Sequence, residues 1–185
     1  EALREQIIEG AAESDDELTE KYLEVGELTD EELARGIGLG IVNRTLLPVL
    51  CGDASRSIGT KQLLDFIAGQ MPSPDQMPAK TAYKNGGEDE VQLSCDPDGP
   101  LAASVFKTIS ESVGDLSFVR VYSGTLKPGD DVFNSSGRVN ERIGQVYSLS
   151  GHDRKEASSV PAGDMGALIK LKDTHTGNVI CGRRD

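Results

Sequence analysis

The change in hydrophobic spacing near residue 72 restricts the fold of this chain more than any other feature. Before it, apolar residues recur every three or four positions, as in residues 61–71 (KQLLDFIAGQM), which is the spacing of an amphipathic helix. From residue 81 onward helical spacing disappears, and short runs rich in β-branched residues alternate with Gly, Asp, Pro and Asn. Three prolines at the change, Pro72, Pro74 and Pro78, forbid a continuous helix. The sequence therefore predicts an α+β chain in two parts.

Start and stop signals predict helices in the first forty residues. Residues 2–12 (ALREQIIEGAA) have helical spacing, with Gly10 loosening the end. Ser14 and Thr29 each open an acidic run, SDDE and TDEE, in which the hydroxyl and the last carboxylate form a capping box at the start of a further helix. The glycine cluster RGIGLG (residues 35–40) is expected to end a helix rather than to bind phosphate, because a phosphate loop follows a strand.

A short continuous apolar run follows the predicted helices. Residues 45–52 (TLLPVLCG) fit a buried strand, and a polar turn separates them from the helix at residues 61–71. The order of strand, turn and helix predicts one α/β unit, which the prolines close. We place the end of the first part at residue 75.

The region after the prolines is expected to form a small closed barrel or a sandwich. Its apolar runs are short, and turn formers such as KPGD (residues 127–130) separate them. The segment TAYKNGGEDE (residues 81–90) is expected to be an exposed hairpin or a mobile loop. We therefore divide this region into a linker with a variable insert, residues 76–99, and a barrel, residues 100–185.

The net charge of −12 is unevenly distributed along the chain. Residues 1–60 contain five Lys or Arg against fourteen Asp or Glu, whereas residues 100–185 contain eleven against ten. A surface that binds a polyanion needs clustered cations, so the only plausible nucleic-acid face lies after residue 100. The acidic amino-terminal run is more typical of solvated, capped helices than of a metal site.

Composition favours a cytoplasmic protein with no metal site and no membrane anchor. No apolar run approaches the roughly 20 residues that span a bilayer, and the amino end is acidic rather than a basic leader. The three cysteines, Cys51, Cys95 and Cys181, are scattered and form no C-x-x-C pair. This favours reduced thiols over a disulfide framework or a structural zinc site.

The chain lacks a complete catalytic motif. No G-x-x-x-x-G-K-[ST] sequence is present to hold nucleotide phosphates, and a turn before a strand explains DPDG (residues 96–99). His152 and His175 lie among turn formers and are expected at the surface, with no positioned nucleophile beside them. We therefore expect no catalytic residues.

Several motifs of the predicted barrel closely resemble domain 2 of elongation factor G. In chain order they are VFKT (residues 105–108), RVYSG (120–124), ERIG (141–144), AGD (162–164), LKD (171–173) and TG (176–177). The first part of the chain is similar to the end of the inserted subdomain, and the last strand and helix, of that family's GTPase domain. The resemblance implies a helical and α/β remnant of a P-loop GTPase domain followed by a translation-factor β-barrel.

The resemblance implies a nucleotide contact in the loop after the apolar run. In this family the backbone of a Gly-Ser-Ala motif touches the guanine base, and the matching positions here are Gly52, Asp53 and Ala54. Asp53 replaces the serine, so a carboxylate near the base would alter guanine affinity or selectivity. GTP is expected in the full-length protein, a GTPase, whereas this piece alone is expected to bind no cofactor and to catalyse no reaction.

The resemblance also implies docking on the ribosome. In relatives the barrel rests on RNA of the small ribosomal subunit and packs against the GTPase domain. Arg138, Arg142, Arg154 and Lys155 are the cations expected to contact phosphates, since they flank strand ends and loops. Alternatively, they are solvated edge charges that deter sheet-to-sheet aggregation.

Three functions remain open at this point. The first is ribosomal translocation during protein synthesis by an elongation factor G-like GTPase, of which this chain is a ribosome-docking and interdomain module. The second is a ribosome-protection or recycling paralogue of the same family, which Asp53 and the acidic insert permit. The third is a stand-alone protein-interaction module whose acidic helices bind a basic partner.

Overall fold

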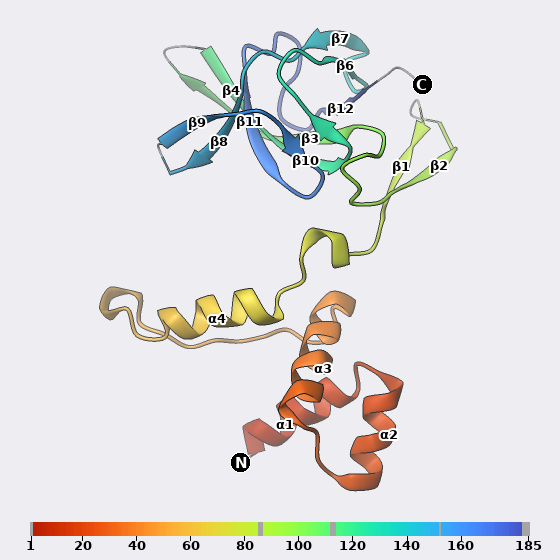
Figure 1. Ribbon diagram of the computed structural model, residues 1–185, viewed down its shortest axis with the longest axis vertical. Helices are drawn as coiled ribbons and strands as arrows, with labels where there is room; N and C mark the ends of the chain where they lie inside the picture. The colour runs from red at the N-terminus through yellow and green to blue at the C-terminus, as the bar shows by residue number, and fades with distance from the viewer. Residues whose placement is uncertain (1, 85–86, 112–113, 152, 183–185) are drawn as a thin grey trace. The chain divides into compact units, whose positions relative to one another are not determined.

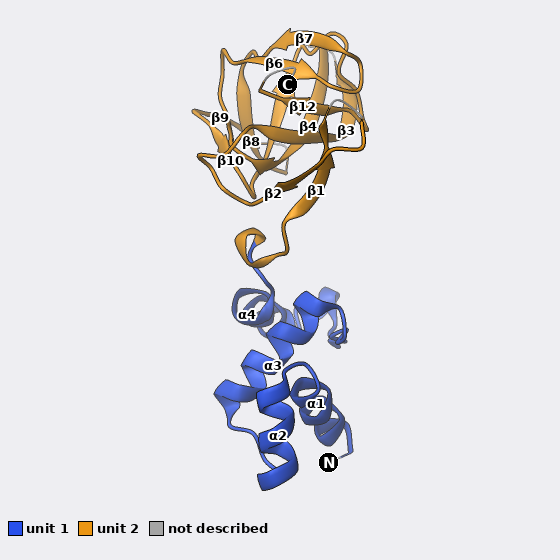
Figure 2. Ribbon diagram, turned by 90° about the vertical axis from the view of Figure 1, so that its right-hand side faces the viewer, with its two compact units in different colours: residues 1–73 blue, residues 74–185 orange. Residues whose placement is uncertain are grey.

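The computed structural model describes residues 2–84, 87–111, 114–151 and 153–182. The chain divides into two compact units, residues 1–73 and residues 74–185, which are coloured separately in Figure 2. The first contains the α-helices and the second contains the named strands (Figure 1). Among the described residues, no helix combines the length and the apolar character that crossing a membrane requires.

The first unit is a small helical body. Its elements are α1 (Ala2–Ala12), α2 (Asp16–Val25), α3 (Asp30–Asn43), the 3₁₀ helix η1 (Ala54–Arg56) and α4 (Thr60–Gln70). Helix α1 packs against both α2 and α3. Ala11, Ala12 and Leu18 are buried where these helices meet, so small and branched side chains make this core.

The predicted capping boxes are found at one helix start and not at the other. Thr29 caps α3: its hydroxyl accepts from the Glu32 amide at 3.3 Å, and the Glu32 carboxylate accepts from the Thr29 amide at 2.9 Å. The prediction that Ser14 caps the second helix is wrong by one residue, because Asp15 is the N-cap and accepts from the Leu18 amide at 3.2 Å. The Ser14 hydroxyl donates instead to the carbonyl of α1 residue Gly10 at 3.0 Å.

The glycine cluster lies inside α3, so the prediction that it ends a helix is wrong. A Cβ atom on Gly36 would lie 2.4 Å from the carbonyl oxygen of Ala11, and one on Gly40 would lie 2.8 Å from Cβ of Leu46. Glycine therefore allows α3 to approach α1 and the segment that follows α3, and this close packing offsets its low helix propensity. The helix ends at its C-cap Arg44, which has a φ of 61°.

The apolar run at residues 45–52 forms no strand, so the prediction of a buried strand is wrong. Two of its large apolar side chains face solvent, with Leu47 85% and Val49 88% exposed. A strand needs a neighbour for its backbone groups, and among the described residues no named strand pairs with this segment. The helix predicted next to it is confirmed as α4, which begins after Gly59.

The second unit opens with a hairpin. The 3₁₀ helix η2 (Pro74–Gln76) precedes β1 (Lys80–Tyr83) and β2 (Glu90–Leu93), which pair antiparallel. Of the two alternatives for residues 81–90, the structure has the hairpin, and residues 85–86 lie outside the described part of the chain.

The remaining strands form a β-barrel-like body (Figure 2). They are β3 (Ala102–Glu111), β4 (Gly114–Ser123), β5 (Thr125–Leu126), β6 (Asp131–Asn134), β7 (Val139–Arg142), β8 (Val146–Ser150), β9 (Asp153–Ala157), β10 (Val160–Pro161), β11 (Met165–Ile169) and β12 (Val179–Cys181). Within the described ranges, one antiparallel sheet has the order β7-β6-β12-β3-β4-β11-β8-β9, and β5 pairs with β10 separately. The predicted α+β class with a β-barrel is confirmed.

Branched aliphatic side chains fill the barrel core. The buried cluster includes Val105, Val119, Val121, Leu126, Val132, Ile143, Val146, Leu168 and Ile180. The predicted KPGD turn is confirmed, because the Asp130 amide donates to the Lys127 carbonyl at 3.3 Å and Gly129 has a φ of 87°. The DPDG turn is confirmed too, by the Gly99 amide, which donates to the Asp96 carbonyl at 3.1 Å.

Candidate functional site

The predicted base-contact loop is a compact turn between the apolar run and α4. The amide of Asp53 donates to the carbonyl of Ile58, and the amide of Ile58 donates to the carbonyl of Asp53, each at 2.9 Å. A Cβ atom on Gly52 would lie 2.8 Å from the Ile58 carbonyl oxygen. The loop therefore needs glycine at its entrance, while Gly52 and Ala54 remain exposed on its surface.

The carboxylate of Asp53 is turned onto its own loop. Its Oδ1 accepts from the Ser55 hydroxyl at 2.6 Å, the Ser55 amide at 3.0 Å and the Arg56 amide at 3.3 Å. The hydrogen bond from the Ser55 hydroxyl, followed by those from the two amides, holds the pKa of Asp53 below its ordinary value. Asp53 thus acts as the N-cap of η1, so its charge is engaged within the loop.

The four predicted phosphate-contacting cations fall into two pairs. Arg138 and Arg142 belong to the β6–β7 hairpin, whereas Arg154 and Lys155 lie on β9. Strands β7 and β9 stand at opposite ends of the strand order, and Figures 1 and 2 show them on different sides of the barrel. The structure therefore does not bring all four cations into one site.

On β9, Arg154 already has an acidic partner. Its guanidinium group contacts both carboxylate oxygens of Glu111, the last residue of β3. This hydrogen bond is the main cause that lowers the pKa of Glu111 and raises the pKa of Arg154. The pair joins β9 to the end of β3, and it leaves Lys155 as the exposed cation of this strand without such a partner among the described residues.

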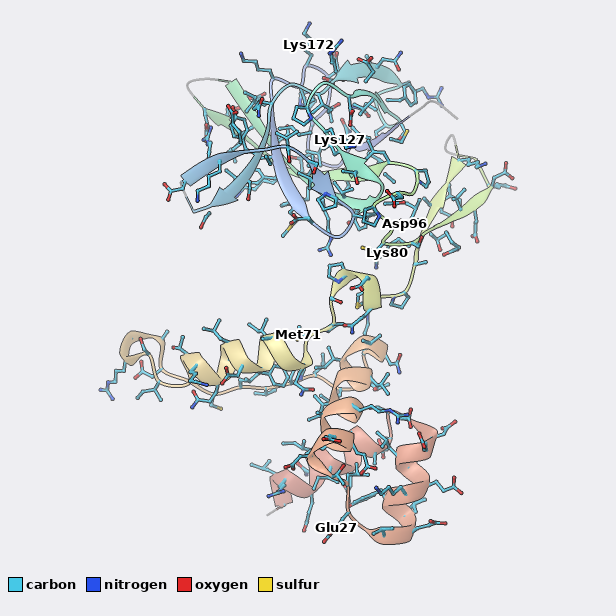
Figure 3. All side chains as sticks on the ribbon, in the orientation of Figure 1. Glu27, Met71, Lys80, Asp96, Lys127 and Lys172 are labelled. Atoms are coloured by element: carbon cyan, nitrogen blue, oxygen red, sulfur yellow. The ribbon has the colours of Figure 1, made fainter. Side chains whose placement is uncertain are left out.

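The β6–β7 hairpin presents cations that are less engaged. Arg138 sits in its turn with a φ of 55°, Arg142 ends β7, and both side chains are exposed. Lys172, which the sequence did not single out as a phosphate contact, adjoins β7, because its amide donates to the Glu141 carboxylate at 2.8 Å. In the described part of the chain, none of the three cations forms an ion pair. Lys172 is labelled at the edge of the barrel in Figure 3.

Of the two histidines, the structure describes His175. His175 is exposed, as predicted, and its amide donates to the Asn178 side chain at 2.9 Å. His152 lies outside the described residues.

Comparison with known proteins places this barrel in a family. Residues 100–183 match the family model for elongation factor G domain 2. A crystal structure of a protein from Thermus thermophilus matches the whole chain with a TM-score of 0.74 at 30% sequence identity. The barrel of this chain is therefore an elongation factor G domain 2.

Domain 2 thus comprises β3 to β12, together with the cations at both sides of the barrel. Residues 1–99 lie outside the matched domain 2 segment, but the crystal structure covers 100% of this chain, the helical unit included. The chain spans 25% of the length of that protein.

Proposed function

We propose that this chain is part of an elongation factor G-type GTPase that promotes ribosomal translocation during protein synthesis in the cytoplasm. The observation that carries the proposal is the match of residues 100–183 to elongation factor G domain 2. In this proposal the barrel docks on RNA of the small ribosomal subunit and packs against the remainder of the parent GTPase. The chain by itself acts as a docking and interdomain module and catalyses nothing.

The proposed domain limits assign residues 1–75 to the end of the GTPase domain, with part of its inserted subdomain. Residues 76–99 are the linker and insert, and residues 100–185 are domain 2. The exposed apolar side chains of the run at residues 45–52 and of α4 support the first assignment, because such side chains are normally buried. A sheet from the preceding part of a GTPase domain would cover them.

GTP is the cofactor of the full-length protein in this proposal, and Gly52, Asp53 and Ala54 contact its guanine base. The Asp53 carboxylate accepts from the Ser55 hydroxyl and from the amides of Ser55 and Arg56, so its charge is engaged within the loop. This arrangement supports a guanine contact through the backbone despite the replacement of serine.

For RNA contact we favour Arg138 and Arg142 over Arg154 and Lys155. A guanidinium group that already binds a carboxylate must lose that partner before it binds a phosphate, and Arg154 is in this state. Arg138 and Arg142 lie on an exposed hairpin without an ion-pair partner in the described residues. Lys155 is a secondary contact at the other side of the barrel.

The test is binding of this chain to purified small ribosomal subunits and, separately, to GTP. We expect binding to subunits that weakens as salt rises, because phosphate contacts release counterions, and no retained GTP. The double variant Arg138→Ala/Arg142→Ala should lose most of the subunit binding, while Lys61→Ala, an exposed cation on α4, serves as the matched control. Tight GTP binding by this chain, or no affinity for subunits, would refute the proposal.

A ribosome-protection or recycling factor of the same family is the second candidate, and Asp53 in place of serine is the observation that favours it. The two candidates predict different activities for the full-length protein. Movement of messenger RNA by one codon supports the translocation factor, whereas drug release or subunit splitting without such movement supports the paralogue.

A further inference from the structure

A buried polar network fastens the β6–β7 hairpin to the loop at residues 171–178. Asn134 at the end of β6 is 0% exposed and Thr174 in the loop is 1% exposed. The Asn134 amide nitrogen donates to the Asp173 carbonyl at 3.1 Å, the Thr174 hydroxyl at 2.9 Å and Oδ1 of Asn178 at 3.1 Å. One buried side chain thus holds three points of the loop.

Glu141 on β7 holds the same loop from a second strand. Its carboxylate accepts from the Lys172 amide at 2.8 Å, the Asp173 amide at 3.2 Å and the Thr174 hydroxyl. The Thr174 hydroxyl accepts from Asn134 and donates to Glu141, so it links these two side chains directly. The backbone of Asp173 joins them as well, because its carbonyl accepts from Asn134 and its amide donates to Glu141. Loss of the Thr174 hydroxyl would remove the side-chain link and leave the backbone link.

The network also fixes the turn of the hairpin. The amide of Gly137 donates to Oδ1 of Asn134 at 2.8 Å, one residue before Arg138. The three cations of this region are therefore held close to the network: Arg138 follows Gly137, Arg142 follows Glu141, and the Lys172 amide binds Glu141. The relative positions of the three cations therefore depend on contacts made by Asn134 and Glu141, not on contacts of the cations' own side chains.

A buried polar network lowers stability unless all its groups are paired, but it favours one arrangement of the segments that it joins. Buried polar groups cost stability unless each has a partner, and in the described residues no buried side-chain polar atom lacks one. Apolar side chains would fill the same space at lower cost. What the polar groups add is one defined arrangement of the hairpin and the loop.

The spacing of the cations matters here because acids lie among them. Asp131 is the cross-strand neighbour of Arg142, and Asp173 follows Lys172. The net field of this mixed surface is weak, so attraction to RNA depends on each cation reaching a phosphate rather than on a broad positive potential. If the loop shifted by one residue, the acidic Asp173 would stand where the cation Lys172 now stands.

We infer that Thr174, together with Asn134 and Glu141, is a positioning group that holds Arg138, Arg142 and Lys172 in place to contact phosphates in the RNA of the small ribosomal subunit. This inference rests on the proposed function. Lys172 is, in consequence, a further RNA contact of the barrel.

The test compares two substitutions at one position. Thr174→Val keeps the shape and removes the hydroxyl, whereas Thr174→Ser keeps the hydroxyl. Binding of the whole chain to purified small subunits is measured over a series of salt concentrations. We expect Thr174→Val to weaken binding several-fold and to reduce the salt slope by about 1, as the loss of one phosphate contact does, although no cation is removed. Thr174→Ser should behave like the unchanged chain.

The outcomes separate this inference from the proposed function. If Arg142→Ala reduces affinity and salt slope but Thr174→Val lowers only the melting temperature, the network is merely structural and the inference is overturned. If Arg138→Ala, Arg142→Ala and Lys172→Ala all leave subunit binding unchanged, the proposed RNA contact fails as well. Should Thr174→Val not fold, Glu141→Gln replaces one acceptor oxygen by a donor, and an unchanged salt slope for it would overturn the inference equally.

Discussion

Glu32 accepts hydrogen bonds from two parts of the helical unit. Its carboxylate binds the Thr29 amide and hydroxyl at the start of α3, and it also accepts from the ammonium group of Lys21 on α2. The bond from Lys21 is the largest cause that lowers the pKa of Glu32 from 4.5 to about 2, followed by the bond from the Thr29 amide. The charged form of one side chain therefore joins two helices.

This depressed pKa predicts a loss of stability in acid. Because the folded pKa lies below the unfolded value, the contribution of Glu32 is complete above pH 4.5 and is lost as the pH falls toward about 2. The free energy of unfolding is measured by urea unfolding of the whole chain, followed by the helical circular dichroism of the first unit. As the pH falls over this range, this free energy should decrease less in Glu32→Gln than in the unchanged chain. Glu31→Gln, on the exposed neighbour, is the control and should keep the original pH dependence.

The hydrogen bonds of Asn134 give a second prediction, which concerns the stability of the barrel. Asn134→Ala removes the donor and the acceptor that serve Thr174, Asn178 and Gly137, so buried groups lose their partners. We expect the barrel to lose about 1–3 kcal/mol of stability, measured by calorimetry. Asn140→Ala, at an exposed position of β7, should change stability by no more than about 0.5 kcal/mol. Equal effects of the two variants would contradict the role assigned to the network.

Among the helices, the approach of α3 to α1 depends on glycine. A Cβ atom on Gly36 would meet the backbone of Ala11 at 2.4 Å, whereas one on Gly38 would meet its nearest neighbour at 3.9 Å. Gly36→Ala should therefore destabilise the helical unit by about 1–3 kcal/mol, the cost of an overpacked core. Gly38→Ala should stabilise it by up to about 1 kcal/mol, because alanine favours the helix and has room. Urea unfolding followed by circular dichroism measures both, and shifts of the same sign would count against the close crossing.

Element by element, local signals in the sequence predicted what local contacts decide. The Thr29 capping box and the KPGD turn depend on neighbours close in the chain, and they are found. The strands after residue 100 are found too, because their β-branched composition is local, although some pair with distant strands, as β12 does with β3. The glycine cluster was predicted wrongly to end a helix. Its glycines allow a close contact between helices about 25 residues apart in the chain, and the spacing of residues along one helix does not reveal such a contact. The missing strand at residues 45–52 shows the same limit, since a strand exists only with a partner.

The candidate site was predictable to a similar degree. Positions after strand ends indicated Arg138 and Arg142 correctly as exposed cations, but no sequence pattern paired Arg154 with Glu111, because 43 residues separate them. No sequence pattern singled out Asn134 or Thr174. Only the fold shows that their side chains point into the barrel end rather than into solvent.

At the scale of the whole molecule, the apolar run at residues 45–52 and α4 both carry large apolar side chains that no other part of the described chain buries. Leu47, Val49, Leu64 and Ile67 are all substantially exposed within the first unit. In the proposed assignment these side chains lie against the sheet of a complete GTPase domain. The same side chains would then be surface residues in this chain and core residues in the parent protein.

The double substitution Leu47→Ser/Val49→Ser distinguishes these two states. In this chain it should leave stability within about 0.5 kcal/mol, because both side chains are already in water, and it should reduce the binding of a hydrophobic dye. In the full-length protein it should cost about 1.5–3 kcal/mol for each side chain that the complete domain buries. Calorimetry on both proteins makes the comparison, with Leu3→Ser on α1, 76% exposed, as the control that should be neutral in the chain. A neutral result in the full-length protein would remove the assignment of residues 1–75 to the GTPase domain, because the buried strand of that domain requires these two side chains.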